Sequence, residues 1–422
     1  MTKIKFIHTA DLHLDTPFKG LSNWNSELAG KLKNATFAAF RNIVELCLRE
    51  HVDFLLISGD TFDSENRSLA AQLKFVSELK RLSDNGVRVY FICGNHDPLN
   101  AWLEDLQMPE NVFRFNAEEV ENFTFPKNGR SIADIYGISF RNKTVNKNLA
   151  RSYRLKVQPA PLNIALLHGT VGTPDLHENY APFKIDDIID KGFDYWALGH
   201  IHKRQVHRSE PPVVVYPGNP QGRDFGETGT RGCYMVELNE NKNPDISFIP
   251  TQLIRFERLE IDLTGENTVN VIPEKIREAI INLDDYEENT SYIVRITLEG
   301  RTLLHSYFNK PEEMRELMDF LNDGQMSQNY FIWVDSIEVN TQPNINIEQV
   351  RERSDFPAEI LAAIEYYESN PDKLKELIDN ADKGFTSHQA KREINELSEC
   401  DKREIIEKTK WMLLEQLIKE EE

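Results

Sequence analysis

Short apolar runs alternate with amphipathic helical segments over the first 250 residues, and this alternation most restricts the possible fold. Apolar runs at 3–7, 53–57 and 87–93 predict strands, and apolar residues spaced three or four apart predict helices at 34–51 and 68–84. Strand–helix–strand order at this spacing predicts an α/β fold with helices packed on the faces of a sheet. Five more apolar runs predict further strands, at 134–140, 163–167, 193–198, 213–216 and 233–238.

The chain is too long for one hydrophobic core. Its 422 residues exceed the roughly 250–300 at which single cores usually stop growing. After residue 250 the pattern changes to three strands with two helices between them, which predicts a small α+β unit. Beyond Pro343 the sequence is acidic and helical to its end. We therefore expect three domains, at 1–250, 251–343 and 344–422.

The net charge of −20 is distributed unevenly. Residues 1–200 hold 23 of the 49 basic and 25 of the 69 acidic side chains, so the remainder of the chain holds 26 and 44. The amino-terminal part is therefore close to neutral and the rest is strongly acidic, which indicates separate roles. This distribution excludes a uniformly basic nucleic-acid binder and leaves a local basic surface open.

The cysteines and the amino terminus predict a reduced, cytoplasmic protein. No CxxC spacing is present, so neither a disulfide framework nor a zinc–thiolate site is expected. No apolar run approaches the roughly 20 residues that cross a bilayer, and the amino terminus lacks the apolar core of a signal peptide. The four cysteines are Cys47, Cys93, Cys233 and Cys400.

Five short polar motifs each follow one of the apolar runs. In open α/β sheets, ligands bind beyond the carboxyl ends of the strands, so these motifs are expected to converge although they span 190 residues. Glycines at 59, 94 and 199 allow tight turns and a close approach of the backbone. The motifs are Asp11-Leu12-His13, Gly59-Asp60, Gly94-Asn95-His96-Asp97, His168-Gly169 and Gly199-His200-Ile201-His202.

The side chains of these motifs fit a centre with two metal ions. Carboxylate, imidazole and carboxamide suit manganese, iron or zinc, and no thiolate takes part. Two ions that share one carboxylate stabilise both the attacking and the leaving oxygen in phosphoryl transfer. Such a centre needs about seven protein ligands, and the motifs supply seven: Asp11, His13, Asp60, Asn95, His168, His200 and His202.

The order DxH, GD, GNHD, H, GHxH resembles the calcineurin-like metallophosphoesterase superfamily. Within it, HTADLHLD, SGDTFD, GNHD, GHIH and YPGNPQGRDFGE are similar to the SbcD-type DNA repair exonucleases, particularly their YhaO-like branch. The resemblance implies a β-sandwich flanked by helices, followed by a small α+β capping domain and a helical carboxyl-terminal tail.

The resemblance also assigns roles to single residues. Asp11, His13 and His202 would bind one metal ion, Asn95, His168 and His200 would bind the other, and Asp60 would bridge them. His96 would act on the leaving oxygen, oriented by Asp97. The preferred metal would be manganese, and water activated by the metal ions would attack the phosphodiester in line.

The function implied is a Mn²⁺-dependent DNA exo/endonuclease in double-strand break repair. The resemblance further implies an SbcC-type coiled-coil ATPase partner, held through carboxyl-terminal helices, and a possible homodimer. Two alternatives remain open. One is a metallophosphodiesterase for nucleotides or other small phosphoesters, and the other is a scaffold that has lost catalysis.

Two basic clusters are candidates for DNA contact. The run 141–156 contains six basic residues and no acid, Arg151 and Arg154 among them. It is either a surface that tracks phosphates or a solvated connector. A second cluster, Lys203, Arg204 and Arg208, directly follows the predicted ligand His202 and would flank the reaction centre.

Overall fold

The computed structural model divides the chain into two compact units. Unit 1 contains Met1–Arg258, Glu287–Val294 and Gly324–Trp333, and unit 2 contains Leu259–Tyr286, Arg295–Asp323 and Val334–Glu422. The predicted three-domain division stays a prediction. The structure describes residues 3–14, 16, 26–63, 68–103, 106–172, 180–239, 244–382 and 398–419.

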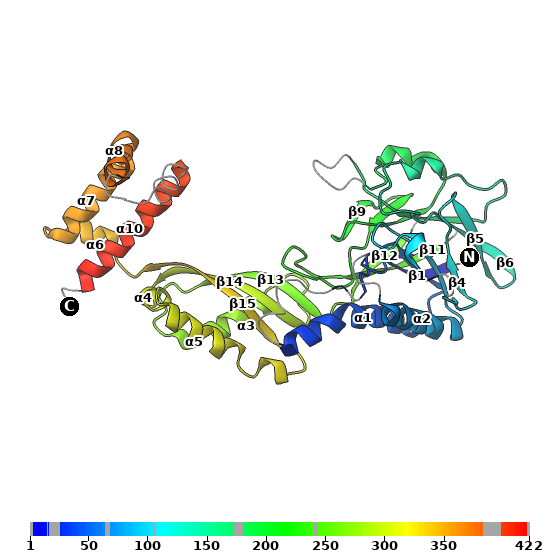
Figure 1. Cartoon of the computed structure of the whole chain (residues 1–422), viewed down its shortest axis with the longest axis horizontal. Coiled ribbons are helices and arrows are strands. Elements are labelled where there is room, and N and C mark those ends of the chain that lie inside the picture. Colours follow the sequence, from blue (N-terminus) through cyan, green and yellow to red (C-terminus); the bar gives the residue numbers. More distant parts are fainter. Residues whose placement is uncertain are drawn as a thin grey trace. The chain divides into compact units, whose positions relative to one another are not determined.

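Unit 1 contains two six-stranded sheets (Figure 1). In the first, β1, β2, β3 and β4 run parallel, β11 pairs with β1 in the antiparallel sense, and β12 pairs with β11 in the antiparallel sense. Its order is β12 (Asp245–Pro250), β11 (Gly232–Asn239), β1 (Lys3–Thr9), β2 (Phe54–Ser58), β3 (Arg88–Ile92) and β4 (Val112–Arg114).

The second sheet also has four neighbouring parallel strands, but its antiparallel strands are placed differently. Its four inner strands, β6, β7, β8 and β10, are parallel, and one antiparallel strand lies at each edge. Its order is β5 (Glu121–Lys127), β6 (Arg130–Gly137), β7 (Leu162–His168), β8 (Tyr195–Gly199), β10 (Val213–Tyr216) and β9 (Gln205–Arg208).

The two sheets pack face to face, because the inner strands carry apolar side chains on both of their faces. One face of each sheet packs against the other sheet. Phe6 and Phe54 of the first sheet meet Ile164 and Tyr195 of the second in one buried cluster. On the outer face of the first sheet, α1 (Ser26–Arg49) and α2 (Leu69–Asp84) lie side by side (Figure 1). The predicted sandwich flanked by helices is therefore confirmed.

The outer face of the second sheet is covered by loops and short 3₁₀ segments, with Tyr153, Phe193 and Trp196 in its core. These segments are η2 (Leu149–Ser152), η3 (Ile185–Asp187) and η4 (Ile189–Lys191), and η1 (Leu99–Ala101) follows β3. Cys47, Cys93 and Cys233 are buried and not in disulfides.

A third sheet has the order β13 (Ile254–Asp262), β14 (Ser291–Thr302) and β15 (Ile332–Pro343). In unit 2, helices lie beside it (Figure 1). Three of the carboxyl-terminal helices share a small core around Val350, Leu361 and Leu414. The remaining elements are η5 (Val269–Val271), α3 (Ile272–Ile281), α4 (His305–Phe308), α5 (Pro311–Asn322), η6 (Gln325–Ser327), α6 (Ile347–Arg351), α7 (Phe356–Ser369), α8 (Pro371–Asp382) and α10 (Glu399–Lys419).

Four strands were not expected from the sequence, namely β4, β5, β9 and β12. Each lies at an edge of one of the two large sheets. An edge strand is partly exposed, so it lacks the continuous apolar run that marks an inner strand. The helix expected at 34–51 is longer and spans Ser26–Arg49, and the strand expected at 134–140 spans Arg130–Gly137.

Candidate metal centre

The carboxyl ends of β1, β2 and β3 bring the first three motifs together. Beyond the strand ends, the amide of Asp11 donates to the carbonyl of Gly59 (3.0 Å), and the amide of His13 donates to that of Asp60 (3.1 Å). These bonds continue the parallel pairing of β1 and β2 into the loops. Asp11 and Asp60 are therefore fixed next to each other by the backbone.

The second sheet delivers the other two motifs to the same place. His168 is the last residue of β7, and His200 directly follows β8. The amide of His200 donates to both carboxylate oxygens of Asp11, at 2.9 and 3.1 Å. This contact links the two sheets across their carboxyl ends, so the predicted convergence of the motifs occurs.

One cluster consists of Asp11, His13 and His202, whose candidate ligand atoms lie within 4.8 Å of one another. The Nε2 atoms of His13 and His202 are 3.0 Å apart. His202 Nδ1 donates to Glu227 Oε1 at 2.7 Å, which leaves a lone pair on its Nε2. His13 Nδ1 is buried and has no hydrogen-bond partner among the residues that the structure describes.

The other cluster consists of Asp60, His168 and His200, and Asn95 joins it. His168 Nδ1 donates to the carbonyl of Ser58 at 2.9 Å. Its Nε2 therefore carries a lone pair, which faces Asn95 Oδ1 at 2.9 Å and Asp60 Oδ2 at 3.3 Å. All three atoms are acceptors when the ring is neutral, so a cation between them is favoured. Burial lowers the pKa of His168, but the charge of Asp60 outweighs burial and raises this pKa to about 9, so either a proton on Nε2 or a metal ion fits between these atoms.

Asp60 lies between the two clusters. Its Oδ2 is 3.3 Å from His168 Nε2 and 3.9 Å from His13 Nε2. Burial opposes its charge, yet His168 and His13 hold the pKa of this carboxyl below its usual range. Burial raises the pKa of Asp11 to about 6, so a nearby cation is needed to keep that carboxylate ionised at lower pH. The donor set fits two divalent ions with Asp60 facing both.

Four of the predicted ligands have left-handed backbone conformations. The φ angles are 52° for Asp11, 43° for His13, 50° for Asp60 and 103° for His200. Residues other than glycine rarely adopt such angles, and they persist only where the surrounding structure enforces them. The backbone is thus held in an unfavourable conformation at four positions that carry predicted metal ligands.

The glycines at 59, 94 and 199 are required by close packing. A Cβ on Gly94 would lie 2.2 Å from Asp60 Oδ1, and one on Gly59 would lie 2.4 Å from His168 Nδ1. A Cβ on Gly199 would overlap the carbonyl oxygen of Ser58. The expectation that these glycines permit a close backbone approach is confirmed.

His96 lies beside the clusters, with its ring centroid 5.0 Å from that of His13. The carboxylate that contacts its ring is Asp63, whose Oδ1 is 3.3 Å from His96 Nδ1. The prediction that Asp97 orients His96 is therefore wrong. Asp97 instead accepts from the amides of Gly94 (2.8 Å) and Thr61 (3.0 Å), so it holds the loops that carry the ligands.

Three contributing residues were missed in the sequence, namely Asp63, Glu227 and Arg223. Asp63 is the last residue of SGDTFD, three positions after Asp60, and Glu227 and Arg223 lie in the segment GRDFGE. Both segments contribute to the resemblance to the SbcD-type nucleases, but the resemblance assigned no role to these three residues. A carboxylate three residues after a predicted bridging ligand was the available signal for Asp63. Nothing in the local pattern pairs Glu227 with His202, because this contact depends on tertiary structure.

The predicted DNA contacts have mixed environments. Lys203 and Arg204 are exposed, and the Arg204 guanidinium lies 4.2 Å from the ring centroid of Phe248. Arg208 and Arg154 donate to nearby backbone carbonyls, and Arg151 pairs with Asp187 at 3.0 Å. A role of these five residues in DNA binding stays a prediction.

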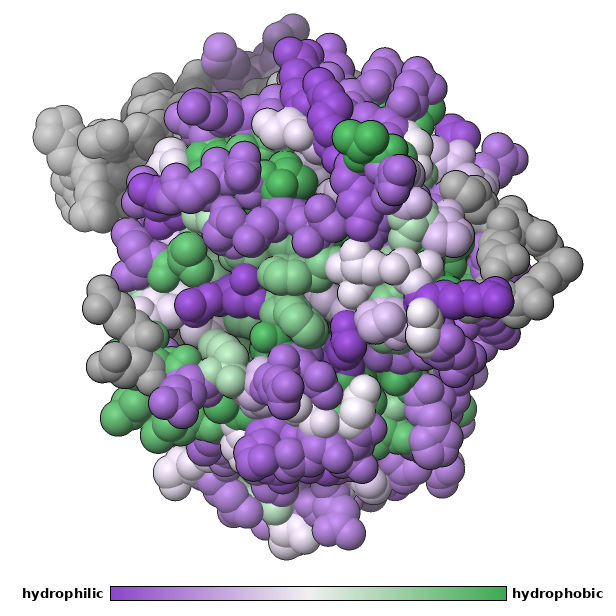
Figure 2. All heavy atoms as spheres, turned by 90° about the vertical axis from the view of Figure 1, so that its right-hand side faces the viewer, coloured by the Kyte–Doolittle hydropathy of each residue, from purple (hydrophilic) through white to green (hydrophobic). Residues whose placement is uncertain are grey.

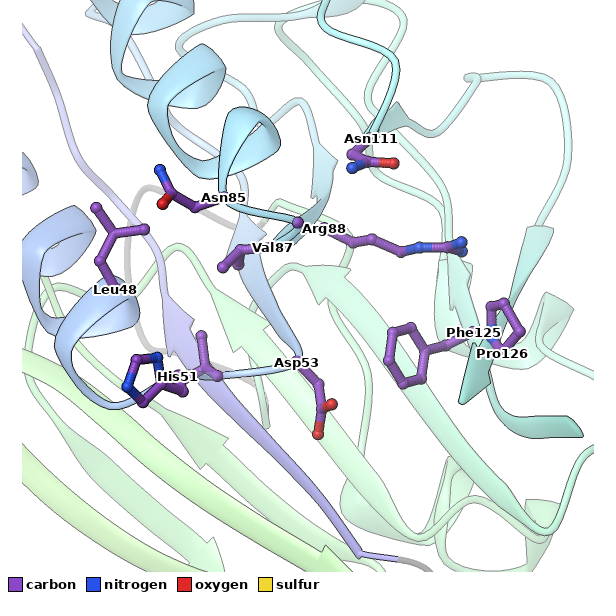
Figure 3. A pocket seen from close by; sticks show the side chains of 11 residues that line it. Leu48, His51, Asp53, Asn85, Val87, Arg88, Asn111, Phe125 and Pro126 are labelled. Atoms are coloured by element: carbon purple, nitrogen blue, oxygen red, sulfur yellow. The ribbon is translucent and has the colours of Figure 1, made fainter. Parts of the chain in front are cut away.

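A polar pocket of about 480 Å³ lies at the amino ends of β2 and β3 (Figure 3). Asp53 and Arg88 are part of its lining, and Arg88 points toward Phe125, with its guanidinium carbon 5.6 Å from the ring centroid. The predicted ligands follow the carboxyl ends of the strands and do not line this pocket.

Hydrophilic residues cover most of the face shown in Figure 2, with hydrophobic residues between them.

Comparison with known proteins identifies the family of this centre. Residues 4–204 match the family described as calcineurin-like phosphoesterase, and residues 256–342 match the middle domain of metallophosphoesterase YhaO. The uncharacterized metallophosphoesterase YhaO of Bacillus subtilis (strain 168) is 37% identical over 350 residues, which cover 82% of this chain and 84% of that protein. The chain belongs to the calcineurin-like metallophosphoesterases. It fits the YhaO-like branch of that family, as the sequence predicted.

More distant relatives are named DNA double-strand break repair protein Mre11. Those of Sulfurisphaera tokodaii and Saccharolobus solfataricus are 25% and 24% identical to this chain. The alignments cover 76% and 71% of this chain, and 79% and 76% of the relatives.

Membership in the family confirms the predicted enzyme class, so this metallophosphoesterase is a metal-dependent phosphodiesterase. Its cofactors are divalent metal ions, for which the two clusters provide fitting side chains. Within the described part of the chain, no helix combines the length and apolarity needed to cross a bilayer.

Proposed function

We propose that this metallophosphoesterase is a Mn²⁺-dependent DNA exo/endonuclease that hydrolyses phosphodiester bonds with two metal ions. The observation that carries the proposal is the arrangement of the two clusters. Seven donor side chains from five strand ends, with Asp60 between the other six, lie next to the His96–Asp63 pair. Divalent ions bound there would activate a water molecule and neutralise charge on the phosphate.

The residues of the chain then have separate tasks. Ser58 and Glu227 fix the proton of His168 and His202 on Nδ1, so both rings present Nε2 as a ligand. Asp60 offers its carboxylate to both clusters. No Ser or Cys nucleophile is needed, because water is the attacking group.

His96 is placed to donate a proton to the leaving oxygen. Burial by itself would lower the pKa of the His96 imidazole. The hydrogen bond to Asp63 and the charge of Asp60 outweigh the effect of burial, so the pKa of His96 is raised above its usual value. With Nδ1 held by Asp63, the protonated ring has Nε2 left to donate. Asp63 thus takes the orienting task that had been expected of Asp97.

DNA as the substrate is supported by the relatives named Mre11 and by the exposed basic pair that follows His202, Lys203 and Arg204. We extend the proposal to double-strand break repair in the cytoplasm, with a coiled-coil ATPase partner of the SbcC type. The carboxyl-terminal helices α7 and α10 are the proposed docking elements for that partner. Manganese is proposed because the resemblance to the SbcD-type nucleases implies it, and the carboxylates, imidazoles and carboxamide of the donor set are compatible with that ion.

The test uses the full chain with linear duplex and single-stranded DNA. Each substrate is incubated with Mn²⁺, Mg²⁺ or a chelator, and bis-p-nitrophenyl phosphate is assayed in parallel. The proposal expects DNA degradation that needs Mn²⁺ and is lost in His96→Ala. Hydrolysis of the small diester with DNA left intact, even with a coiled-coil ATPase added, would favour the small-phosphoester alternative. Hydrolysis of neither substrate would favour the scaffold.

A further inference from the structure

Arg223 is a partly buried arginine next to the first metal cluster, and the metal-binding roles above do not use it. Its Nη2 lies 3.0 Å from His202 Nδ1 and donates to Glu227 Oε1 at 2.7 Å. Its Nε is 3.2 Å from both Glu227 oxygens, and its backbone amide donates to Oε2 at 2.9 Å. The Arg223 side chain is 18% exposed, so its guanidinium is held in one position.

Glu227 connects this arginine to the metal ligand. The same carboxylate accepts from His202 Nδ1 at 2.7 Å and from Asn219 Nδ2 at 2.7 Å. Burial opposes the charge of Glu227, but His202 and Arg223 hold its pKa below the usual range. Glu227 is therefore ionised, and it orients His202 and Arg223 together.

Burial opposes the charge of Arg223, but Glu227, Asp63 and Asp224 stabilise it and raise the pKa of this guanidinium. Its charge acts on His13 and on Asp63, so it lies near both the first cluster and the His96–Asp63 pair. A fixed cation beside a site for metal ions repels those ions, and the ionised Glu227 paired with it offsets that repulsion. A phosphate bound to the metal ions would carry the opposite charge.

One end of the guanidinium remains open. Nε and Nη2 contact Glu227 and His202, whereas Nη1 has no hydrogen-bond partner among the described residues. The Arg223 side chain keeps 18% of its surface exposed, so a ligand can reach it. Guanidinium groups bind phosphate oxygens with charge-assisted hydrogen bonds, which are stronger than neutral ones.

We propose that Arg223 binds a non-bridging oxygen of the substrate phosphate through Nη1, and that Glu227 is the positioning residue for both Arg223 and His202. This inference rests on the proposed function of the same centre, because the phosphate is the one that the metal ions hold.

The test measures binding of inorganic phosphate to the Mn²⁺-loaded protein by calorimetry, together with the manganese content by mass spectrometry. Arg223→Gln should keep the manganese content of the wild type and bind phosphate at least about tenfold more weakly, through loss of a charge-assisted hydrogen bond. Glu227→Gln should lower both quantities. Arg49→Gln is the matched control, because Arg49 is an exposed arginine at the end of α1, and it should match the wild type in both.

Two results would overturn the proposal. One is wild-type phosphate affinity in Arg223→Gln, and the other is loss of manganese in that variant, which would make Arg223 a support of the metal centre alone. If Arg223→Gln does not fold, Arg223→Lys replaces it, because an ammonium cannot contact Glu227 and a phosphate in the same way. Unchanged affinity in Arg223→Lys would then overturn the proposal.

The outcome is separable from that of the nuclease assay. A protein that binds phosphate through Arg223 but hydrolyses neither DNA nor bis-p-nitrophenyl phosphate would refute the proposed function and leave the role of Arg223 standing. If the wild type hydrolyses DNA and Arg223→Gln does not change phosphate binding, the proposed function stands and the role of Arg223 is refuted.

Discussion

At the scale of single residues, the centre depends on backbone conformations that residues other than glycine rarely adopt. Asp11, His13, Asp60 and His200 have positive φ angles, each of which costs on the order of 1–3 kcal/mol for a residue other than glycine. Tight loop packing enforces these angles, and the glycines before Asp60, Asn95 and His200 make that packing possible.

Gly94→Ala should therefore lose metal ions while the protein stays folded. The new Cβ would lie 2.2 Å from Asp60 Oδ1 and would displace the carboxylate that faces both clusters. Gly30→Ala is the control, because a Cβ there meets nothing within 4 Å and the residue is in helix α1. It should keep its metal ions and gain up to about 1 kcal/mol of stability. Full manganese content in Gly94→Ala, measured by mass spectrometry, would contradict the tight packing.

His96→Ala should keep both metal ions but lose most of its turnover. His96 lies outside the seven donor side chains, and its removal takes away the proton donor, which is worth about 10²–10⁴-fold in rate. Rates with bis-p-nitrophenyl phosphate and the manganese content of the purified variant provide the measurement. Turnover equal to that of the wild type would remove His96 from the mechanism.

At the scale of strands and helices, the inner strands of the two sheets carry every predicted ligand at or just beyond their carboxyl ends. The sheets are joined near this edge by His8 of β1, whose Nδ1 lies 3.0 Å from Tyr195 Oη and whose Nε2 lies 3.2 Å from the carbonyl of Leu198. Both partners belong to β8. His8 therefore helps to align the sheet edges that form the centre.

This buried histidine should make the fold sensitive to acid. Burial lowers the pKa of His8 to about 3, whereas the unfolded chain has the ordinary value near 6.5. Below pH 6.5 His8 is protonated in the unfolded chain and stays neutral in the folded protein. The free energy of unfolding therefore falls as the pH falls from 6.5 toward 3. His8→Gln, compared with the wild type by denaturant unfolding at pH 7.5 and pH 5, should show a smaller loss. An equal loss of unfolding free energy in both proteins would exclude His8 as a cause of the acid sensitivity.

At the scale of the whole molecule, the separation of charge bears on the substrate. The net charge of −20 lies almost entirely after residue 200, and that acidic part repels nucleic acid, so DNA is expected to approach a local basic region. Lys203 and Arg204 are exposed and directly follow His202 in sequence. They are therefore the two cations expected to contact DNA nearest to the centre.

Replacing Lys203 and Arg204 together by glutamine should weaken DNA binding for all sequences alike. Each phosphate contact that is lost should reduce the slope of log affinity against log salt by about 1, so the pair should reduce it by about 2. Fluorescence anisotropy over a range of salt concentrations, with Ca²⁺ in place of Mn²⁺, measures the slope. A slope equal to that of the wild type would exclude both residues as phosphate contacts.

The sequence determined the inner strands, the flanking helices and the seven donor side chains. The inner strands are marked by continuous apolar runs, because they are buried on both faces. The donors are marked by their position directly after those runs, since the strand ends of parallel sheets meet at one edge. The four edge strands carry no such mark, because their exposure permits polar residues.

Only the tertiary structure decided which carboxylate serves which histidine. Asp97 is adjacent to His96 in sequence, yet it binds the amides of Gly94 and Thr61, and Asp63 contacts the His96 ring. Glu227 reaches His202 from 25 residues away. Such pairings depend on how loops from different strands pack, and no periodicity within a single segment records them. The sequence thus determined the predicted metal ligands, and the tertiary structure determined which groups orient them.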